Sequence, residues 1–89
     1  MDFEWNPDKA RKNETKHGVS FAEASEVFGD ILSSTVLDPD HSDTEERFVI
    51  FGKSAKNRHL VVSFTERGAK IRIISARSMK RREIAAYEQ

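Results

Sequence analysis

The second half of the chain contains three strand-like runs that are separated only by short connections. The runs are Arg47–Gly52 (RFVIFG), His59–Thr65 (HLVVSFT) and Lys70–Ala76 (KIRIISA). Each run is rich in β-branched and aromatic residues, and a glycine-containing turn at Glu66–Ala69 joins the last two as a hairpin. The chain is therefore expected to fold around a mostly antiparallel sheet.

Apolar residues occupy both odd- and even-numbered positions of the last strand. Successive side chains of a strand point to opposite faces, so one face receives Ile71 and Ile73 and the other Ile74 and Ala76. The sheet is therefore expected to be covered on one face and at least partly on the other. If the strand stays regular through position 77, Arg72 and Arg77 lie on opposite faces.

Two helices are predicted before these strands. Asn6 caps the first, which runs over 7–17 and ends at Gly18, a residue suited to the left-handed position after a helix. Ser20 and Glu23 form a capping box at the start of the second helix. Its apolar stripe, which should lie on the sheet, consists of Phe21, Ala24, Val27, Phe28 and Ile31.

Short strands at 3–5 and 34–37, and a final helix capped by Ser78 and running to about Tyr87, complete the order β-α-α-β-β-β-β-α. The prediction is one α+β domain over residues 1–89, with two N-terminal helices packed on the sheet and a C-terminal helix. Because so short a chain supports only a modest core, Trp5 and Phe64 are expected to be core residues rather than base-stacking platforms.

Composition excludes several classes of protein. The 89 residues include no cysteine, so disulfides and thiolate metal sites are excluded. No apolar run reaches the roughly 20 residues of a membrane helix, and the N-terminus does not resemble a signal peptide. A cytoplasmic protein with no cofactor and no metal is expected. The Asp38–Asp43 segment is expected to be a turn, because it lacks the glycine and terminal glutamate of a calcium loop.

Charge is divided sharply between the two halves of the chain. Residues 1–52 contain five Lys/Arg and twelve Asp/Glu, a net charge of −7, whereas residues 53–89 contain ten and three, a net charge of +7. Such asymmetry indicates contact with a polyanion. The alternative is that the two halves neutralise each other across the fold.

The basic residues are candidates for binding phosphate. They are Arg47, Lys53, Arg58, Arg67, Arg72, Arg77, Lys80, Arg81 and Arg82. Arginine supplies fork-shaped donors that match phosphate oxygens. The last three stand at the start of a helix, where cations oppose the helix dipole and a bound anion would relieve the repulsion. The alternative is a solvated rim with ion pairs to the acidic half.

A histidine in the last turn of the first helix could transfer protons near neutral pH. Lys16 and His17 could instead simply complement the helix dipole. RNA cleavage without a metal needs a base for the 2′-hydroxyl, cations for the charged phosphorane and an acid for the leaving oxygen. His17, Glu66 and Tyr87 are the titratable candidates, and the arginines would stabilise charge.

Three blocks of the chain resemble the BrnT family, the toxins of a bacterial type II toxin–antitoxin pair. The blocks are FEWNPDKARKNETKHGVSFAEA at 3–24, HSDTEERF at 41–48 and RIISARSMKRREIAAYE at 72–88. The resemblance implies a RelE-like fold and a metal-independent endoribonuclease that inhibits translation. It also implies a BrnA-like antitoxin with a ribbon-helix-helix domain, through which the protein would contact DNA only indirectly.

The family pattern falls on Lys16, His17, Arg47, Arg67, Arg72, Arg77, Glu83 and Tyr87. Taken with the basic residues above, it predicts His17, Arg67, Arg77 and Tyr87 as catalytic. The residues expected to bind RNA are Lys16, Arg47, Lys53, Arg58, Arg72 and Arg81. The alternatives are a non-catalytic nucleic-acid-binding module that acts as a co-repressor with a DNA-binding partner, and a small protein whose basic face receives an acidic partner segment.

Overall fold

The computed structural model describes residues 1–42 and 44–89. The elements are β1 (Asp2–Glu4), α1 (Pro7–His17), α2 (Phe21–Ser25), β2 (Ser34–Leu37), β3 (Arg47–Lys53), β4 (His59–Arg67), β5 (Lys70–Ser78) and α3 (Arg81–Tyr87). Two single 3₁₀ turns, η1 (Glu26–Gly29) and η2 (Pro39–His41), follow α2 and β2. Within the described residues, no helix is both long and apolar enough to cross a membrane.

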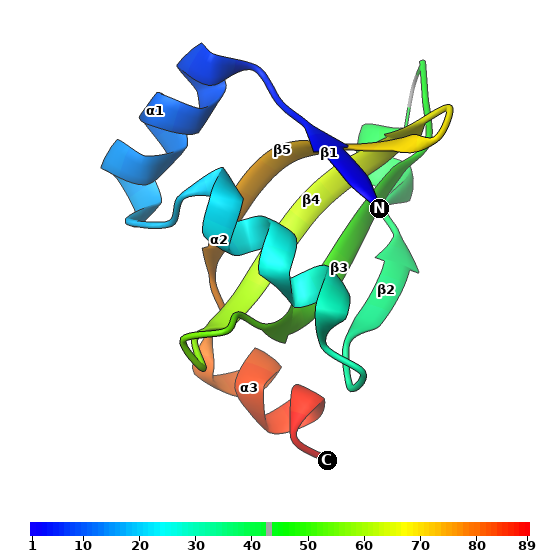
Figure 1. Cartoon of the computed structure of the whole chain (residues 1–89). Helices are drawn as coiled ribbons and strands as arrows, with labels where there is room; N and C mark the ends of the chain where they lie inside the picture. The colour runs from blue at the N-terminus through cyan, green and yellow to red at the C-terminus, as the bar shows by residue number, and fades with distance from the viewer. Residues whose placement is uncertain (43) are drawn as a thin grey trace.

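The five strands form one sheet in the order β1-β5-β4-β3-β2. The β1–β5 pair is parallel and the other three pairs are antiparallel, so the predicted α+β class with a mostly antiparallel sheet is confirmed. Figure 1 shows α2 and η1 crossing one face of the sheet, α1 beside β5, and α3 at one end. We call the face under α2 the helix face and the opposite one the open face.

The core lies between the helix face and α2. Its buried residues include Phe21, Val27, Ile50, Leu60, Val62, Phe64 and Ile73. Phe64 is 5% exposed, and Trp5 packs against this cluster with its ring edge-to-face on Phe21 at 6.0 Å. Both aromatics therefore belong to the core, as the sequence predicts.

Helix α1 begins and ends where the sequence predicts. The Asn6 side chain accepts hydrogen bonds from the backbone N–H groups of Asp8 (2.9 Å) and Lys9 (3.1 Å). Gly18 ends the helix with φ at 70°, a conformation that is costly for residues with a Cβ atom. These local devices hold His17 in the last turn of the helix.

Asn13 joins α1 to the edge of β5. Strand β1 pairs only with Lys70 to Arg72, so the later part of that edge needs another partner. The Asn13 amide supplies it, accepting from the Ala76 N–H (3.0 Å) and donating to the carbonyls of Ala76 (2.9 Å) and Val19 (2.9 Å). One buried side chain thus replaces a neighbouring strand and holds α1 against the sheet.

Replacing Asn13 with alanine is expected to lower the free energy of unfolding by about 2 kcal/mol. The substitution leaves three buried backbone groups without a partner. Each unsatisfied group costs roughly 1–3 kcal/mol, and water that enters the space left by the side chain reduces the total by bonding to some of these groups. Urea unfolding followed by circular dichroism measures the change. Thr15→Ala, on the exposed side of the same helix, is the control and should stay within about 0.5 kcal/mol. Equal effects of the two substitutions would contradict the assigned role.

The second helix is shorter than predicted, and two expectations about it are wrong. The α-helix ends at Ser25, and the 3₁₀ turn that follows has 3.0 residues per turn, so the apolar stripe does not continue to Ile31, which is 95% exposed. Ser20 does cap the helix, accepting from the Glu23 N–H at 3.0 Å. The Glu23 side chain does not return the bond, because it is paired with Arg58.

Strand β5 is irregular, which corrects the prediction for its side chains. Ser63 pairs with Ser75 but Phe64 pairs with Ile73, so β5 has one extra residue and its alternation shifts. Ile73 and Ala76 are consequently both in the core, not on opposite faces. Arg72 lies opposite Thr65 and Arg77 opposite Val61. Because directly opposed residues share a face, the bulge places both arginines on the open face.

The C-terminal helix starts later than predicted. Ser78 is the last residue of β5, where it pairs with Leu60, and so does not cap the helix. Lys80 occupies the cap position, and its backbone N–H donates to Glu83 Oε1 at 2.7 Å. Helix α3 therefore begins with a carboxylate already bound at its N-terminus.

Candidate functional site

A groove of about 380 Å³ lies on the open face of the sheet. Its floor includes Val49, Val61 and Ser63, and the loop at Pro39 forms one wall. Two of the predicted catalytic residues, His17 from the end of α1 and Arg77 from β5, line this same groove although they are far apart in sequence. The Asn13 bonds to Ala76 explain how the end of α1 comes to lie beside Arg77.

Arg77 is held in place by Glu83. Its Nη1 and Nη2 atoms donate to the two carboxylate oxygens at 2.9 and 3.0 Å, and Nη1 also donates to the Ser78 carbonyl at 3.1 Å. The hydrogen bonds from Arg77 lower the pKa of Glu83 to about 2, so the pair is ionised near neutral pH. Within the described part of the chain these bonds use three of the five guanidinium N–H donors, which leaves two for an anion.

Tyr87 does not line the groove of His17 and Arg77. It lines a second cavity, between the β2–β3 pair and α3, and its hydroxyl donates a hydrogen bond to Asp30. Burial and this bond raise the pKa of Tyr87 to about 12, so its proton is tightly held. Asp30 also accepts from the backbone N–H groups of Lys53 (2.8 Å) and Leu32 (2.9 Å). Tyr87 thus attaches α3 to the rest of the fold.

Three of the predicted basic residues lie at the other end of the open face. Arg47 and Arg72 flank Thr65 on the two neighbouring strands, and Arg72 pairs with Glu4 at 2.8 Å. Arg67 is six residues beyond the strand position opposite Arg77, or roughly 20 Å along β4. It pairs with Glu45 at 3.3 Å. The structure therefore does not bring Arg67 to the groove of His17 and Arg77.

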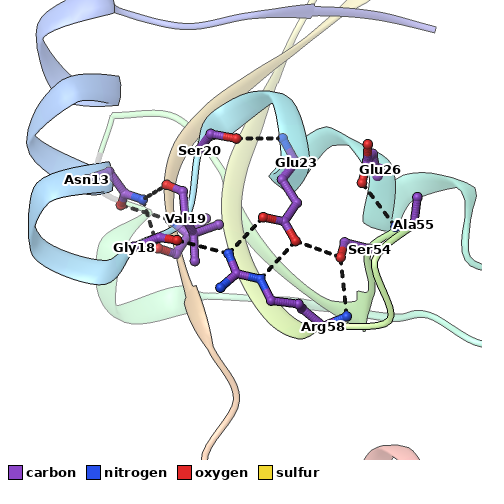
Figure 2. A network of polar contacts seen from close by, with 10 residues as sticks. Asn13, Gly18, Val19, Ser20, Glu23, Glu26, Ser54, Ala55 and Arg58 are labelled. Atoms are coloured by element: carbon purple, nitrogen blue, oxygen red, sulfur yellow. Dashed lines mark hydrogen bonds and ion pairs between the residues drawn. The ribbon is translucent and has the colours of Figure 1, made fainter.

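Arg58 is engaged on the side of the helices (Figure 2). Its Nε and Nη2 atoms donate to the two oxygens of Glu23 at 2.9 and 2.7 Å, and Nη2 also donates to the Gly18 carbonyl at 2.9 Å. The Ser54 hydroxyl donates to the same carboxylate at 2.8 Å. The hydrogen bond from Arg58 lowers the pKa of Glu23. Arg58 therefore links the loop after β3 to α2.

The remaining predicted RNA-binding residues lie near the surface at three separate places. Lys16 is exposed in the last turn of α1, Lys53 is half-buried at the end of β3, and Arg81 is exposed at the start of α3. The alternative that the two halves neutralise each other also finds support. Within the described residues, three ion pairs join the acidic half to the basic half: Glu4–Arg72, Glu23–Arg58 and Glu45–Arg67.

The acidic segment after β2 forms the expected turn where it is described. Pro39–His41 is the 3₁₀ turn η2, His41 Nδ1 lies 2.9 Å from Asp38 Oδ2, and the Ser42 hydroxyl accepts from the Arg47 N–H at 3.0 Å. Asp43, the last residue of the predicted turn, lies outside the described residues. In 1–42 and 44–89, no three His, Cys, Asp or Glu side chains are arranged to hold a metal ion.

Sequence reasoning missed Asn13, Asp30 and Phe51. Asn13 and Asp30 act through backbone groups distant in sequence, so no local pattern marks them. Phe51 lines both the groove and the second cavity. Its signal was present, because RFVIFG has apolar residues at both parities and so indicates an open face that is partly apolar.

Comparison with known proteins agrees with this fold. The model of the family described as "Ribonuclease toxin, BrnT, of type II toxin-antitoxin system" matches residues 5–83. Among solved structures, the chain is similar to the crystal structure of the Brucella abortus ribonuclease toxin BrnT. The two share 25% sequence identity, with a TM-score of 0.67, over 91% of this chain and 99% of that one. No curated protein matches the sequence.

Proposed function

We propose that this chain, which belongs to the BrnT family of type II toxin–antitoxin ribonuclease toxins, is a metal-independent endoribonuclease that inhibits translation. The proposal is carried by one observation, that His17 and Arg77 line a single groove on the open face of the sheet. A RelE-like fold and a cytoplasmic location belong to the same proposal.

The RNA supplies its own nucleophile in this reaction. His17 removes the proton of a 2′-hydroxyl, and the 2′-oxygen forms a bond to the adjacent phosphorus. Arg77, oriented by Glu83, stabilises the charge that develops on the phosphorane oxygens. The bond to the 5′-oxygen then breaks, that oxygen takes a proton from water, and a 2′,3′-cyclic phosphate remains. The reaction needs no metal because histidine and arginine provide the proton transfer and the positive charge.

The substrate strand is proposed to run along the open face. Arg72 and Arg47 lie on this face away from the groove, in positions to bind phosphates on one side of the cleaved bond. Lys16, which precedes His17 in the last turn of α1, and Arg81, at the start of α3, are exposed and are proposed to bind phosphates on the other side. Arg58 is left out of this surface, because its guanidinium is directed to Glu23 and the Gly18 carbonyl on the side of the helices.

A protein antitoxin is proposed to neutralise the nuclease. Membership in a type II system implies a protein partner, and we propose a BrnA-like protein with a ribbon-helix-helix domain. DNA would then be contacted only through that partner, and the complex would repress its own promoter.

The proposed function is tested with purified, partner-free protein and single-stranded RNA, with and without a chelator of divalent cations. RNA is expected to be cleaved at internal positions at the same rate in both conditions. Induced expression in a bacterial host should arrest growth and reduce the rate of protein synthesis. Intact RNA over a range of pH and salt would reject the enzyme, and salt-dependent binding without cleavage would instead support a non-catalytic nucleic-acid-binding module.

A further inference from the structure

We propose that the cavity lined by Phe51 and Tyr87 is a subsite for one unpaired nucleobase of the RNA, with the Phe51 ring as its stacking platform. This inference rests on the proposed function, because the base belongs to the strand whose phosphate binds Arg77. It adds a site of base recognition to a surface that otherwise offers contacts to phosphate alone.

The cavity has the size and chemistry of a small-molecule site. Its volume is about 480 Å³, within the roughly 300–1,000 Å³ that such sites occupy. Apolar walls are formed by Leu32 and Val36 on one side and Ala86 on the other. It shares Val36 and Phe51 with the groove of His17 and Arg77, so the two hollows form one continuous surface.

The Phe51 ring is available for stacking. Within the described residues it pairs with no other aromatic ring, and the side chain is partly exposed on the open face. Phe48, three residues earlier, points to the helix face and stacks on Phe64 at 5.5 Å. An exposed aromatic ring on a sheet beside cationic side chains is the arrangement on which proteins stack bases of single-stranded RNA.

The sheet register places this ring beside the proposed reaction centre. Phe51 lies directly opposite Val61, and Val61 lies directly opposite Arg77, so the three residues form one row across adjacent strands. Two strand spacings separate Phe51 from Arg77, or about 10 Å. An arginine side chain and one nucleotide together span such a gap. A phosphate on Arg77 therefore brings a neighbouring base over Phe51.

Charge favours RNA over an apolar protein segment as the occupant. Arg82 lines the same cavity, and Glu83 at its rim is already neutralised by Arg77. The surface that leads into the cavity thus carries cations for a phosphate backbone next to an apolar floor for a base.

The test measures binding of RNA oligonucleotides that the protein recognises but cannot cleave. The sequence is one that the wild-type protein cuts, made with 2′-O-methyl groups so that the nucleophile is blocked. One abasic nucleotide is then placed at each position in turn, and affinity is measured by fluorescence anisotropy. In the wild type, one abasic position near the cleaved bond is expected to weaken binding about 5- to 140-fold, the range for one base–aromatic stack.

Substitution of Phe51 should remove that dependence. Phe51→Leu is expected to bind the intact oligonucleotide as weakly as the wild type binds the abasic one. An abasic nucleotide at that position should then lower the affinity of Phe51→Leu no further. Phe51→Tyr keeps an aromatic ring and should restore the dependence. Phe48→Leu is the matched control, since it removes a ring from the other face of the same strand and should lower stability without changing RNA affinity.

Three results would overturn the subsite while leaving the nuclease intact. The first is wild-type protein that cleaves RNA but tolerates an abasic nucleotide at every position. The second is folded Phe51→Leu protein that keeps the wild-type dependence. The third is folded Phe51→Leu protein that loses affinity for its protein partner but not for RNA. Failure of the wild-type protein to bind any RNA would reject the proposed function and the subsite together.

Discussion

Arg77→Ala should lower the rate of RNA cleavage about 10²- to 10³-fold at saturating enzyme, with a much smaller loss of RNA affinity. This range is typical for removing one preorganised donor that stabilises charge in a transition state. Arg77 is suited to that role because its two Nη atoms donate hydrogen bonds to Glu83 at 2.9 and 3.0 Å. The side chain is therefore already oriented and need not reorganise during the reaction. Single-turnover cleavage and anisotropy measure the two quantities separately.

Arg72→Ala provides the sharpest comparison. Arg72 lies on the same face of the same strand and is also paired with a glutamate, Glu4, at 2.8 Å. Arg72 is proposed to contact a phosphate away from the groove. Its loss should therefore weaken RNA binding and reduce the slope of log affinity against log salt concentration by about 1. The rate of the bound complex should change far less than in Arg77→Ala. Arg11→Ala, on the exposed side of α1, serves as the control for charge alone.

Equal losses from Arg77→Ala and Arg72→Ala in both binding and cleavage would contradict a catalytic role for Arg77. The two arginines would then be equivalent phosphate contacts on one basic face. A folded Arg77→Ala protein with wild-type cleavage would exclude Arg77 from the reaction altogether.

The parts of the fold that local chemistry determines could be predicted from sequence. Helix α1 begins at an Asn-Pro pair and ends at a glycine, and its caps form as the pattern indicates. The hairpin of β4 and β5 likewise follows from two apolar runs around a glycine-containing turn. In both cases the residues that specify the structure are within a few positions of one another.

The parts that depend on register or on distant partners could not be predicted. The extra residue in β5 is defined only by its pairing with β4, yet it decides that Arg72 and Arg77 share a face. The Ser20–Glu23 spacing indicates a capping box, but the glutamate instead pairs with Arg58 of a distant loop. The sequence marks both residues only as arginines. It therefore could not distinguish Arg77, which lines the groove, from Arg58, which is bound to Glu23 on the side of the helices.

The candidate site could be predicted only in part, because it too depends on contacts between residues that are distant in sequence. His17 and Arg77 were both proposed from sequence, and the structure places them in one groove. What brings them together is Asn13, whose bonds to Ala76 were not visible in any motif. Tyr87 and Arg67 were proposed beside them, and the structure places Tyr87 in the adjoining cavity and Arg67 at the far end of β4.

Arg58→Ala is expected to lower the free energy of unfolding by about 3 kcal/mol. Among the described residues, the substitution leaves the Glu23 carboxylate, which is 7% exposed, with only the Ser54 hydroxyl as a side-chain partner. Breaking a buried ion pair in this way costs about 3–5 kcal/mol, and the lower end applies because the Arg58 side chain is 40% exposed. In a domain of this size the melting temperature should fall by roughly 12–24 °C.

The pH dependence identifies the cause of that loss. In the wild type the folded-state pKa of Glu23 is lowered, so the stability from the pair is present above about pH 4.5 and declines as pH falls further. In Arg58→Ala, burial without the cation should raise the pKa of Glu23. The difference in stability between the two proteins should therefore be largest near pH 7 and shrink toward pH 4, as urea unfolding at several pH values would show.

The double variant Arg58→Ala with Glu23→Gln separates two contributions to the loss of stability, the unpaired charge on Glu23 and the lost packing of the Arg58 side chain. A buried neutral amide costs less than a buried carboxylate, so the double variant should recover about 1–2 kcal/mol relative to Arg58→Ala. A loss that is independent of pH and not relieved by Glu23→Gln would assign the effect to the Arg58 bond with the Gly18 carbonyl instead. Measured at a temperature where it is folded, the double variant should also keep wild-type RNA affinity, since Arg58 faces the acidic half of the chain and not the groove of His17 and Arg77.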